Sequence, residues 1–301
     1  MKRKFEKIWN DRYAALIALP GFLYLLIFSY IPMAGVVTAF QNFSFRKPFL
    51  GNEWVGFKWF RKFFNGIYFG RTVTNTLIIS VEGLIIGVVT ATLFALLLNE
   101  IRDGKFKRIT QSISYFPHFI STVVIVGLMG RLLDKDSGLI NLLIARLGGT
   151  KIDFFNKARW FRTLYHGSGL WQGLGWSTII YLGAITAIDP TLYEAATIDG
   201  ASRFQCMRHI TLPGIKPVVM TVVLMNIGSI LNVGATKILL MYTPTTYVTA
   251  DVISTYVYRE GLGKAQYGYG AAIGLFNSIV NITLLLIANA ASKRLTEVGL
   301  F

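Results

Sequence analysis

The chain of 301 residues contains one cysteine and three histidines, and both shortages exclude classes of site. The cysteine, Cys206, has no second cysteine for a disulfide and cannot form a cysteine-based metal site. His118, His166 and His209 are too far apart to show the spacing of metal ligands. The sequence also lacks the glycine-rich loop that binds phosphate, so we expect no ATP hydrolysis by that route. No catalytic residue, bound cofactor or metal is predicted for this chain.

Charge is also scarce, and its position along the chain is more informative than its amount. Only 15% of the residues are charged and 53% are hydrophobic, which lies outside the usual range for soluble globular domains. Apart from Glu82, six stretches are almost free of formal charge, and each is long enough to cross a bilayer as a helix of about 20 residues. These stretches are residues 13–45, 72–99, 109–130, 163–188, 217–236 and 265–292.

The six uncharged stretches predict an all-α membrane protein with six transmembrane helices. The first stretch is too long for the apolar part of a signal peptide, so we expect it to remain as a helix. The predicted domain organisation is an N-terminal segment at 1–12, a membrane domain at 13–292 and a tail at 293–301. The expected helices cover about residues 13–40, 74–98, 111–133, 168–188, 216–240 and 269–291.

Basic residues gather in the segments that connect the predicted helices. Lysines and arginines crowd the first 12 residues and the short loop after the second helix, which favours a cytoplasmic N-terminus. With six spans, the C-terminus is then cytoplasmic too. The formal charge of +15 is better explained by contact with anionic lipid headgroups than by nucleic acid, because no soluble segment carries a basic stripe with interleaved aromatic residues.

Glu82 and Lys237 are ionisable residues within predicted helices, where charge is costly. Glu82 is interpreted either as a polar group in a translocation path or as a residue that hydrogen-bonds a neighbour or extends to the interface. Lys237, near the end of the fifth helix, has the same two interpretations, of which extension to the interface is favoured.

The segment from Tyr193 to Pro213 is a polar island between two very hydrophobic stretches. Asp189 and Pro190 form a helix start, because aspartate caps free amide groups and proline has no amide proton to leave unpaired. Gly200 permits the left-handed conformation that ends a helix. A second helix is expected over 202–209, after which Leu212-Pro213 redirects the chain into the fifth helix. Capped helices carrying small residues suit docking into a groove of a partner.

The island also carries the pattern Glu-Ala-Ala, three residues, Gly, nine residues, Ile, one residue, Leu-Pro. This pattern resembles the signature of ABC importer permeases. The stretches ALLLNEIRDGKFKRITQSISYFPHFIS, IDPTLYEAATIDGASRF, HITLPGIKPVV and EVGLF resemble the carbohydrate branch, in particular permeases for oligosaccharides and polysaccharides. The likeness covers almost the whole chain. It departs from the maltose-permease form, because extra N-terminal helices and a large external domain are lacking.

The resemblance implies a type I ABC importer permease fold in a bacterial cytoplasmic membrane. The implied partners are a second permease subunit, expected to form a heterodimer, two cytoplasmic ATPase subunits that bind ATP and Mg, an extracellular solute-binding protein, and a sugar. The loop at 189–215, between the fourth and fifth helices, is expected to couple the permease to the ATPase, with Glu194 making a charge-assisted hydrogen bond. The expected coupling residues are Glu194, Ala195, Ala196, Asp199, Gly200, Ile210, Leu212 and Pro213.

The helices on either side of this loop carry the candidate substrate residues that the resemblance implies. Uncharged hydrogen-bonding groups and an aromatic face suit a neutral sugar, although asparagine and serine also join membrane helices to one another. A permease for a non-sugar solute and, less favoured, a secondary transporter remain as alternative functions. The candidate substrate residues are Gln172, Gly173, Trp176, Asn226, Ser229 and Asn232.

Overall fold

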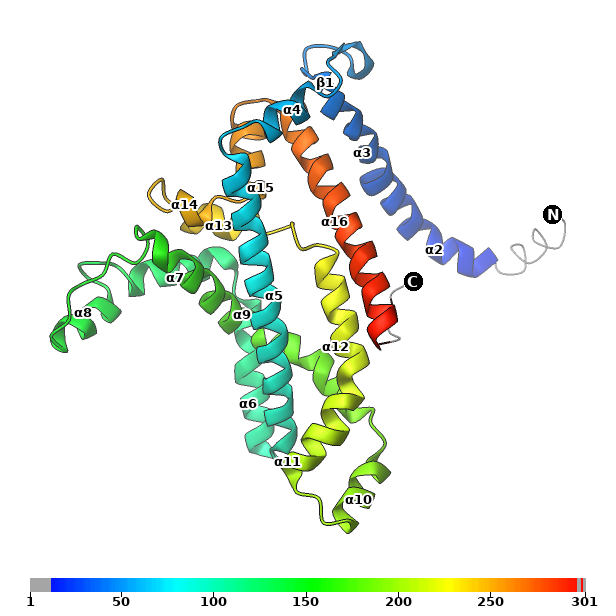
Figure 1. Ribbon diagram of the computed structural model, residues 1–301, viewed down its shortest axis with the longest axis vertical. Coiled ribbons are helices and arrows are strands. Elements are labelled where there is room, and N and C mark those ends of the chain that lie inside the picture. Colours follow the sequence, from blue (N-terminus) through cyan, green and yellow to red (C-terminus); the bar gives the residue numbers. More distant parts are fainter. Residues whose placement is uncertain (1–11, 297–298, 300–301) are drawn as a thin grey trace. The chain divides into compact units, whose positions relative to one another are not determined.

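A computed structural model describes residues 12–296 and residue 299 of the chain (Figure 1). The chain forms two compact units: residues 1–65 with 260–275, and residues 66–259 with 276–301. The predicted N-terminal segment at 1–12 lies outside the described residues except for Arg12. The same is true of the closing stretch EVGLF except for Gly299.

The first unit begins with one helical stretch that changes its winding along its length. Pro20 lies inside α2 and Pro32 lies at the start of α3. Proline removes an amide donor, so departures from regular α-helix near it are expected. An antiparallel pair of short strands follows, with Gln41 opposite Trp54. The elements are α2 (Arg12–Leu25), the π-helix η1 (Leu26–Tyr30), α3 (Ile31–Met33), the 3-10 helices η2 (Ala34–Phe40) and η3 (Phe49–Gly51), β1 (Gln41–Asn42), β2 (Glu53–Trp54) and α4 (Lys58–Phe64).

The second unit is built on two long helices, α5 and α9, that pack against each other. Gly175 of α9 allows a close approach to α6, because a Cβ atom there would overlap the backbone carbonyl of Ser114. The elements up to the polar island are α5 (Phe69–Glu100), α6 (Lys105–Tyr115), the 3-10 helix η4 (Phe116–Phe119), α7 (Thr122–Leu132), α8 (Leu139–Arg146) and α9 (Ala158–Thr186).

The remainder of the chain contains more short helices than the sequence predicted. The segment 241–268, expected to be a loop, contains α14, α15 and η6. The elements are α10 (Pro190–Ile198), α11 (Arg203–Cys206), the π-helix η5 (Met207–Thr211), α12 (Leu212–Ile227), α13 (Ala235–Met241), α14 (Tyr247–Ala250), α15 (Ile253–Val257), the π-helix η6 (Tyr258–Gly263) and α16 (Tyr267–Thr296).

Four helices among the described residues are long and apolar enough to cross a membrane, and a bent pair could add a fifth. The four are Leu16–Phe40, Phe69–Glu100, Arg203–Ile227 and Tyr267–Arg294; the first, second and fourth of these agree with the predicted first, second and sixth helices, and the third overlaps the predicted fifth helix in part. The predicted fourth helix corresponds to α9. With 29 residues, α9 is long enough, but its glycines, serines and Gln172 make it less apolar.

The predicted third helix is not continuous, which corrects the sequence-based expectation. The stretches Lys105–Phe119 and Thr122–Leu132 meet at an angle of 98°. Pro117 lies in the 3-10 turn before the break, and Ser121 starts the next helix by accepting a hydrogen bond from the amide of Val124 at 3.4 Å. The side chain of Gln172 donates to the carbonyl of Ile120 at 2.8 Å, which satisfies a backbone group that the break would leave unpaired.

The predicted fifth helix is also different from the expectation of one helix over 216–240. It begins earlier, at Arg203, because the turns of α11, η5 and α12 run on without a break through Pro213. The π-helical turn Met207–Thr211 lies shortly before Pro213. It widens the backbone at the point where the ring of Pro213 would otherwise crowd a carbonyl group. The helix then ends at Ile227, and the chain is unwound until α13 begins at Ala235. We call residues 228–234 the unwound segment.

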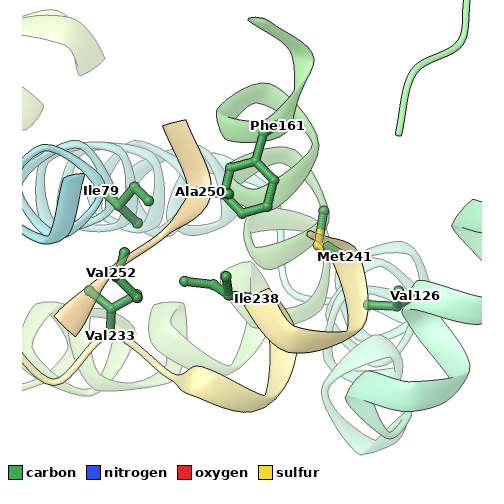
Figure 2. Close-up of a cluster of buried hydrophobic side chains, with 8 residues drawn as sticks. All are labelled: Ile79, Val126, Phe161, Val233, Ile238, Met241, Ala250 and Val252. Carbon is green, nitrogen blue, oxygen red and sulfur yellow. The ribbon is translucent and has the colours of Figure 1, made fainter. Parts of the chain in front are cut away.

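A hydrophobic cluster packs around the end of the unwound segment. Val233 shares this cluster with Ile79 of α5, Phe161 of α9 and Ile238 of α13, as Figure 2 shows. Burial of these apolar side chains is the dominant favourable contribution to folding. The cluster therefore joins α13 to α5 and α9, and it fixes the parts of α5 and α9 that border the cavity described next.

Candidate functional site: a cavity beside the unwound segment

A cavity of about 260 Å³ lies beside the unwound segment. Its walls come from α5, α9, the end of α12 and the unwound segment itself. Three of the predicted substrate residues, Asn226, Ser229 and Asn232, line it together. The other lining residues are Ile79, Ser80, Gly83, Leu84, Tyr165, Ile230, Val233 and Gly234.

The unwound segment is held by turn hydrogen bonds of its own backbone and, in addition, by side chains from other parts of the chain. The amide of Leu231 donates to the side-chain oxygen of Asn281 at 3.0 Å, and Ser254 donates to the carbonyl of Val233 at 2.7 Å. Asn277 and Asn281 both donate to the side-chain oxygen of Asn232, at 2.7 and 3.2 Å. Non-helical backbone inside a membrane protein is tolerated where it is satisfied in this way or lines a cavity.

Polar groups remain available along the cavity wall. Asn226 and Ser229 are exposed, and each donates one hydrogen bond to a backbone carbonyl of its own segment. The hydroxyl of Ser80 is buried and has no hydrogen-bond partner among the described residues. Leaving a buried hydroxyl unpaired is costly, so Ser80 is a further candidate for contact with a bound molecule. Ser80 could not be recognised from the sequence, because a single serine in an apolar helix carries no distinguishing pattern.

A second cavity, of about 220 Å³, shares Gly83 and Tyr165 with the first. Glycines 83, 87, 169 and 173 supply much of its wall, which leaves room that larger side chains would fill. Gly173, another predicted substrate residue, is one of them. The remaining lining residues are Ile86, Thr90, His166, Leu170, Leu174, Ser177 and Lys237.

Glu82 pairs with residues of α9. Its carboxylate lies 3.0 Å from the imidazole of His166 and 3.9 Å from the guanidinium of Arg162. The interpretation of Glu82 as a residue that hydrogen-bonds a neighbour is therefore confirmed. Arg162 also donates to the side-chain oxygen of Asn75 at 3.1 Å, so the pair belongs to a larger polar contact between α5 and α9.

Gln172 and Trp176, the two other predicted substrate residues, face the broken third helix instead. Gln172 bonds to Ile120, and Trp176 stacks on the ring of His118 with centroids 4.4 Å apart and planes at 3°. Neither lines the two cavities. Substrate contact by these two residues therefore stays a prediction that the cavities do not support.

The polar island has the local structure that its sequence predicts at its start and at its turn. The carboxylate of Asp189 accepts a hydrogen bond from the amide of Thr191 at 2.9 Å, and such hydrogen bonds hold the pKa of Asp189 below its usual value. Gly200 has a φ of +79°, the left-handed conformation expected for it. Ser202 begins the second helix with a capping box to Gln205.

One side of α10, the first helix of the island, contacts the start of α12, and its other side is exposed. The hydroxyl of Tyr193 lies 2.9 Å from that of Thr211, at the base of α12. On the free side, Leu192 and Ile198 are exposed, and Glu194 has no ion-pair partner among the described residues. Figure 1 shows α10 and α11 at the end of α12 that is remote from the unwound segment. Apolar side chains beside an unpaired carboxylate are suited to contact with another protein.

The predicted coupling residues fall into two groups in the structure. Glu194, Ala195, Asp199 and Gly200 are exposed in or just after α10, whereas Ala196 is half-buried. The other three lie along the continuous helix that leads into the membrane: Ile210 in η5, and Leu212 and Pro213 at the start of α12. The first group can therefore meet a partner directly, and the second connects that surface with α12.

Comparison with known proteins places this geometry among transport proteins. A family model described as "Binding-protein-dependent transport system inner membrane component" matches residues 83–297. A Bacillus subtilis protein, the polygalacturonan/rhamnogalacturonan transport system permease protein YteP, is 43% identical over all of this chain and 94% of its own length. Protein LplB of the same organism is 40% identical, over 97% of this chain and 92% of its own length.

A solved structure has the same fold along almost the whole chain. A chain in the crystal structure of a bacterial alginate ABC transporter, in complex with an alginate pentasaccharide-bound periplasmic protein, has a TM-score of 0.91 and 38% sequence identity. The match covers 99% of the present chain and 100% of the other.

Proposed function

This chain belongs to the binding-protein-dependent transport system inner membrane component family, and we propose that it imports a sugar oligomer across the cytoplasmic membrane. It is a carbohydrate ABC transporter permease with several membrane-spanning helices. The proposed cargo is an oligosaccharide or a fragment of a polysaccharide, and the relatives named for polygalacturonan and alginate transport favour an acidic one.

The observation that carries the proposal is the cavity beside the unwound segment. Its polar lining comes from amides and hydroxyls, chiefly Asn226, Ser229, Asn232 and Ser80, with the ring of Tyr165 as an aromatic wall. Sugars offer many hydroxyls and apolar C–H faces, which suit such a mixed lining. We propose these five residues and Gly173 as the sugar-contacting set.

We propose that transport is coupled to ATP hydrolysis in separate subunits through the loop at 189–215. The exposed surface of α10 supports this role, because Leu192, Ile198 and Glu194 have few partners of their own within the described chain. In the proposed assembly this chain pairs with a second permease subunit and two ATPase subunits that bind ATP and Mg. A solute-binding protein delivers the sugar from outside.

Transport by a reconstituted complex tests this function directly. We expect ATP-dependent uptake of an oligogalacturonate when the chain is assembled in proteoliposomes with its partner permease, the ATPase subunits and the solute-binding protein. The chain alone should hydrolyse no ATP, because it has no phosphate-binding loop. ATP turnover by the isolated chain, or sugar uptake driven by an ion gradient without the ATPase, would contradict the proposal.

The proposed topology has six spans, with α9 and the bent pair as two of them, and with both termini and the coupling loop in the cytoplasm. Cysteines placed at Ser202 and Lys157 in a Cys206→Ser background should then react from opposite sides of the membrane. The expected result in intact cells is labelling of position 157 alone by an impermeant maleimide. Labelling of both positions from outside would show the topology to be wrong.

A further inference from the structure

Lys237 is the cation in the wall of the second cavity, and the proposed function does not use it. It lies in α13, three residues after the unwound segment ends, and its side chain is half-buried. The sequence analysis favoured extension to the membrane interface. The structure instead turns the side chain across to α9, where its ammonium group lies 2.8 Å from the carbonyl oxygen of Tyr165.

The ammonium group of Lys237 has hydrogen-bond donors available for a further partner. It makes one hydrogen bond, to the Tyr165 carbonyl, and lies 4.8 Å from the centroid of the Tyr165 ring. An ammonium carries three donors, so two remain for another group. Gly169 keeps the space beside it open, because a Cβ atom there would lie 3.2 Å from the ammonium nitrogen. No carboxylate pairs with Lys237 within the described part of the chain.

Glu82, which pairs with His166 of the same cavity wall, does not compensate this charge. Glu82 is engaged by His166 at 3.0 Å and by Arg162 at 3.9 Å. The negative charge of Glu82 is therefore balanced by Arg162, and Lys237 contributes an excess positive charge to the cavity. A partly buried charge without a counter-charge is costly, and an anionic ligand would supply one.

We propose that Lys237 binds a carboxylate of an acidic sugar, a uronate residue, as the oligomer passes through this cavity. The inference rests on the proposed sugar transport and assigns the residue that would recognise the charge of an acidic cargo. One ammonium suits a singly charged carboxylate, whereas a doubly charged phosphate would call for more donors or a second cation. In the same wall, the hydroxyl of Ser177 can donate to or accept from a hydroxyl of the sugar ring, and that of Thr90, which donates to the carbonyl of Ile86, can accept from one.

The test compares an acidic probe with a neutral one of the same length. Fluorescently labelled trigalacturonate and its fully methyl-esterified form are titrated against the complete transporter in lipid nanodiscs, without the solute-binding protein. Lys237→Met should weaken binding of the free acid at least tenfold and binding of the ester at most twofold. Lys237→Arg, which keeps the charge, should retain most of the affinity for the acid. Lys151→Met is the matched control, since Lys151 also donates to a backbone carbonyl, that of Asp136, but on an exposed loop. It should change neither affinity.

The outcomes separate this inference from the proposed function. Equal weakening of acid and ester binding would show that Lys237 has only a structural role, and unchanged binding of the acid would show that it has none. Failure of the wild-type transporter to bind the acid, with binding of the ester or of a neutral oligosaccharide, would also overturn the uronate assignment. In each of these cases the proposed sugar import still stands if the proteoliposomes show ATP-dependent uptake of either the acidic or the neutral oligosaccharide, and it is contradicted only if they take up neither.

Discussion

Loss of coupled transport is the expected result of replacing Gly200 by valine. The φ of +79° at this position is a conformation that a β-branched residue resists, at a cost of about 1–2 kcal/mol for an ordinary residue and more for a branched one. The space around Gly200 is open, since a Cβ atom there would have no neighbour within 4 Å. The effect must therefore act through the backbone of the turn between α10 and α11. We expect sugar uptake and substrate-stimulated ATP hydrolysis to fall at least tenfold, with normal membrane insertion.

Gly200→Asn is the matched control, because asparagine tolerates the left-handed conformation much better. It should keep most of the activity. Should Gly200→Val transport sugar at the wild-type rate, the turn geometry has no role in coupling.

Glu194→Ala tests the same surface without touching the backbone. Glu194 is exposed and has no ion-pair partner among the described residues, so its removal should not destabilise the chain itself. A lost hydrogen bond to a charged group costs about 1.5–3 kcal/mol, which corresponds to weaker association with the ATPase by roughly tenfold or more. Co-purification of the ATPase measures this effect. Asp136→Ala, an exposed acidic residue on another loop, should have no effect on co-purification.

The largest effect on stability is expected from Asp251→Ala. Asp251 is fully buried between α14 and α15, and its carboxylate accepts hydrogen bonds from Arg71 at 2.8 Å and from Arg259 at 2.9 and 3.1 Å. Removing one member of a buried ion pair typically costs about 3–5 kcal/mol, because the remaining charge is left uncompensated. Here one substitution removes a carboxylate that two arginines share. We therefore expect a large fall in the thermal stability of the detergent-solubilised protein, measured by fluorescence-detected size-exclusion chromatography after heating.

A second substitution distinguishes the charge effect from a loss of packing. In the Asp251→Ala background, Arg71→Met removes one uncompensated charge and should recover part of the lost stability. A double variant less stable than Asp251→Ala would contradict this account. Asp136→Ala should leave the melting temperature unchanged.

The sequence predicts the start and the turn of the polar island well because their determinants are local, whereas the expected redirection of the chain at Leu212-Pro213 is wrong, since the helix continues through Pro213. Asp189, Pro190 and Gly200 each act on neighbouring backbone groups, so their roles follow from residue type and order alone. The apolar stretches likewise identify most of the candidate spans, since length and hydropathy are the properties that a bilayer selects.

The breaks in the third and fifth helices could not be predicted in this way. The unwound segment depends on Asn281, 50 residues away in the sequence, whose side chain replaces a helical hydrogen-bond partner for Leu231. The bend after Pro117 depends on Gln172 in the same manner. Hydropathy is nearly the same for a wound and an unwound segment, so only the distant partner reveals the difference. The same reason explains Lys237, because its partner Tyr165 lies 72 residues earlier.

The π-helical turn at Met207–Thr211 has a mechanical consequence for the whole unit. Because it lets the helix pass through Pro213, Arg203–Ile227 forms one rod of 25 residues, about 37 Å long at 1.5 Å per residue. One end of the rod adjoins the turn at Gly200, and the other adjoins Gly228, the first residue of the unwound segment. If the helix were flexible at Pro213, a displacement of the loop would bend the helix there and would not reach its far end. We expect a continuous helix instead to deliver the displacement to its far end, so that Asn226 shifts in the same movement that displaces the loop.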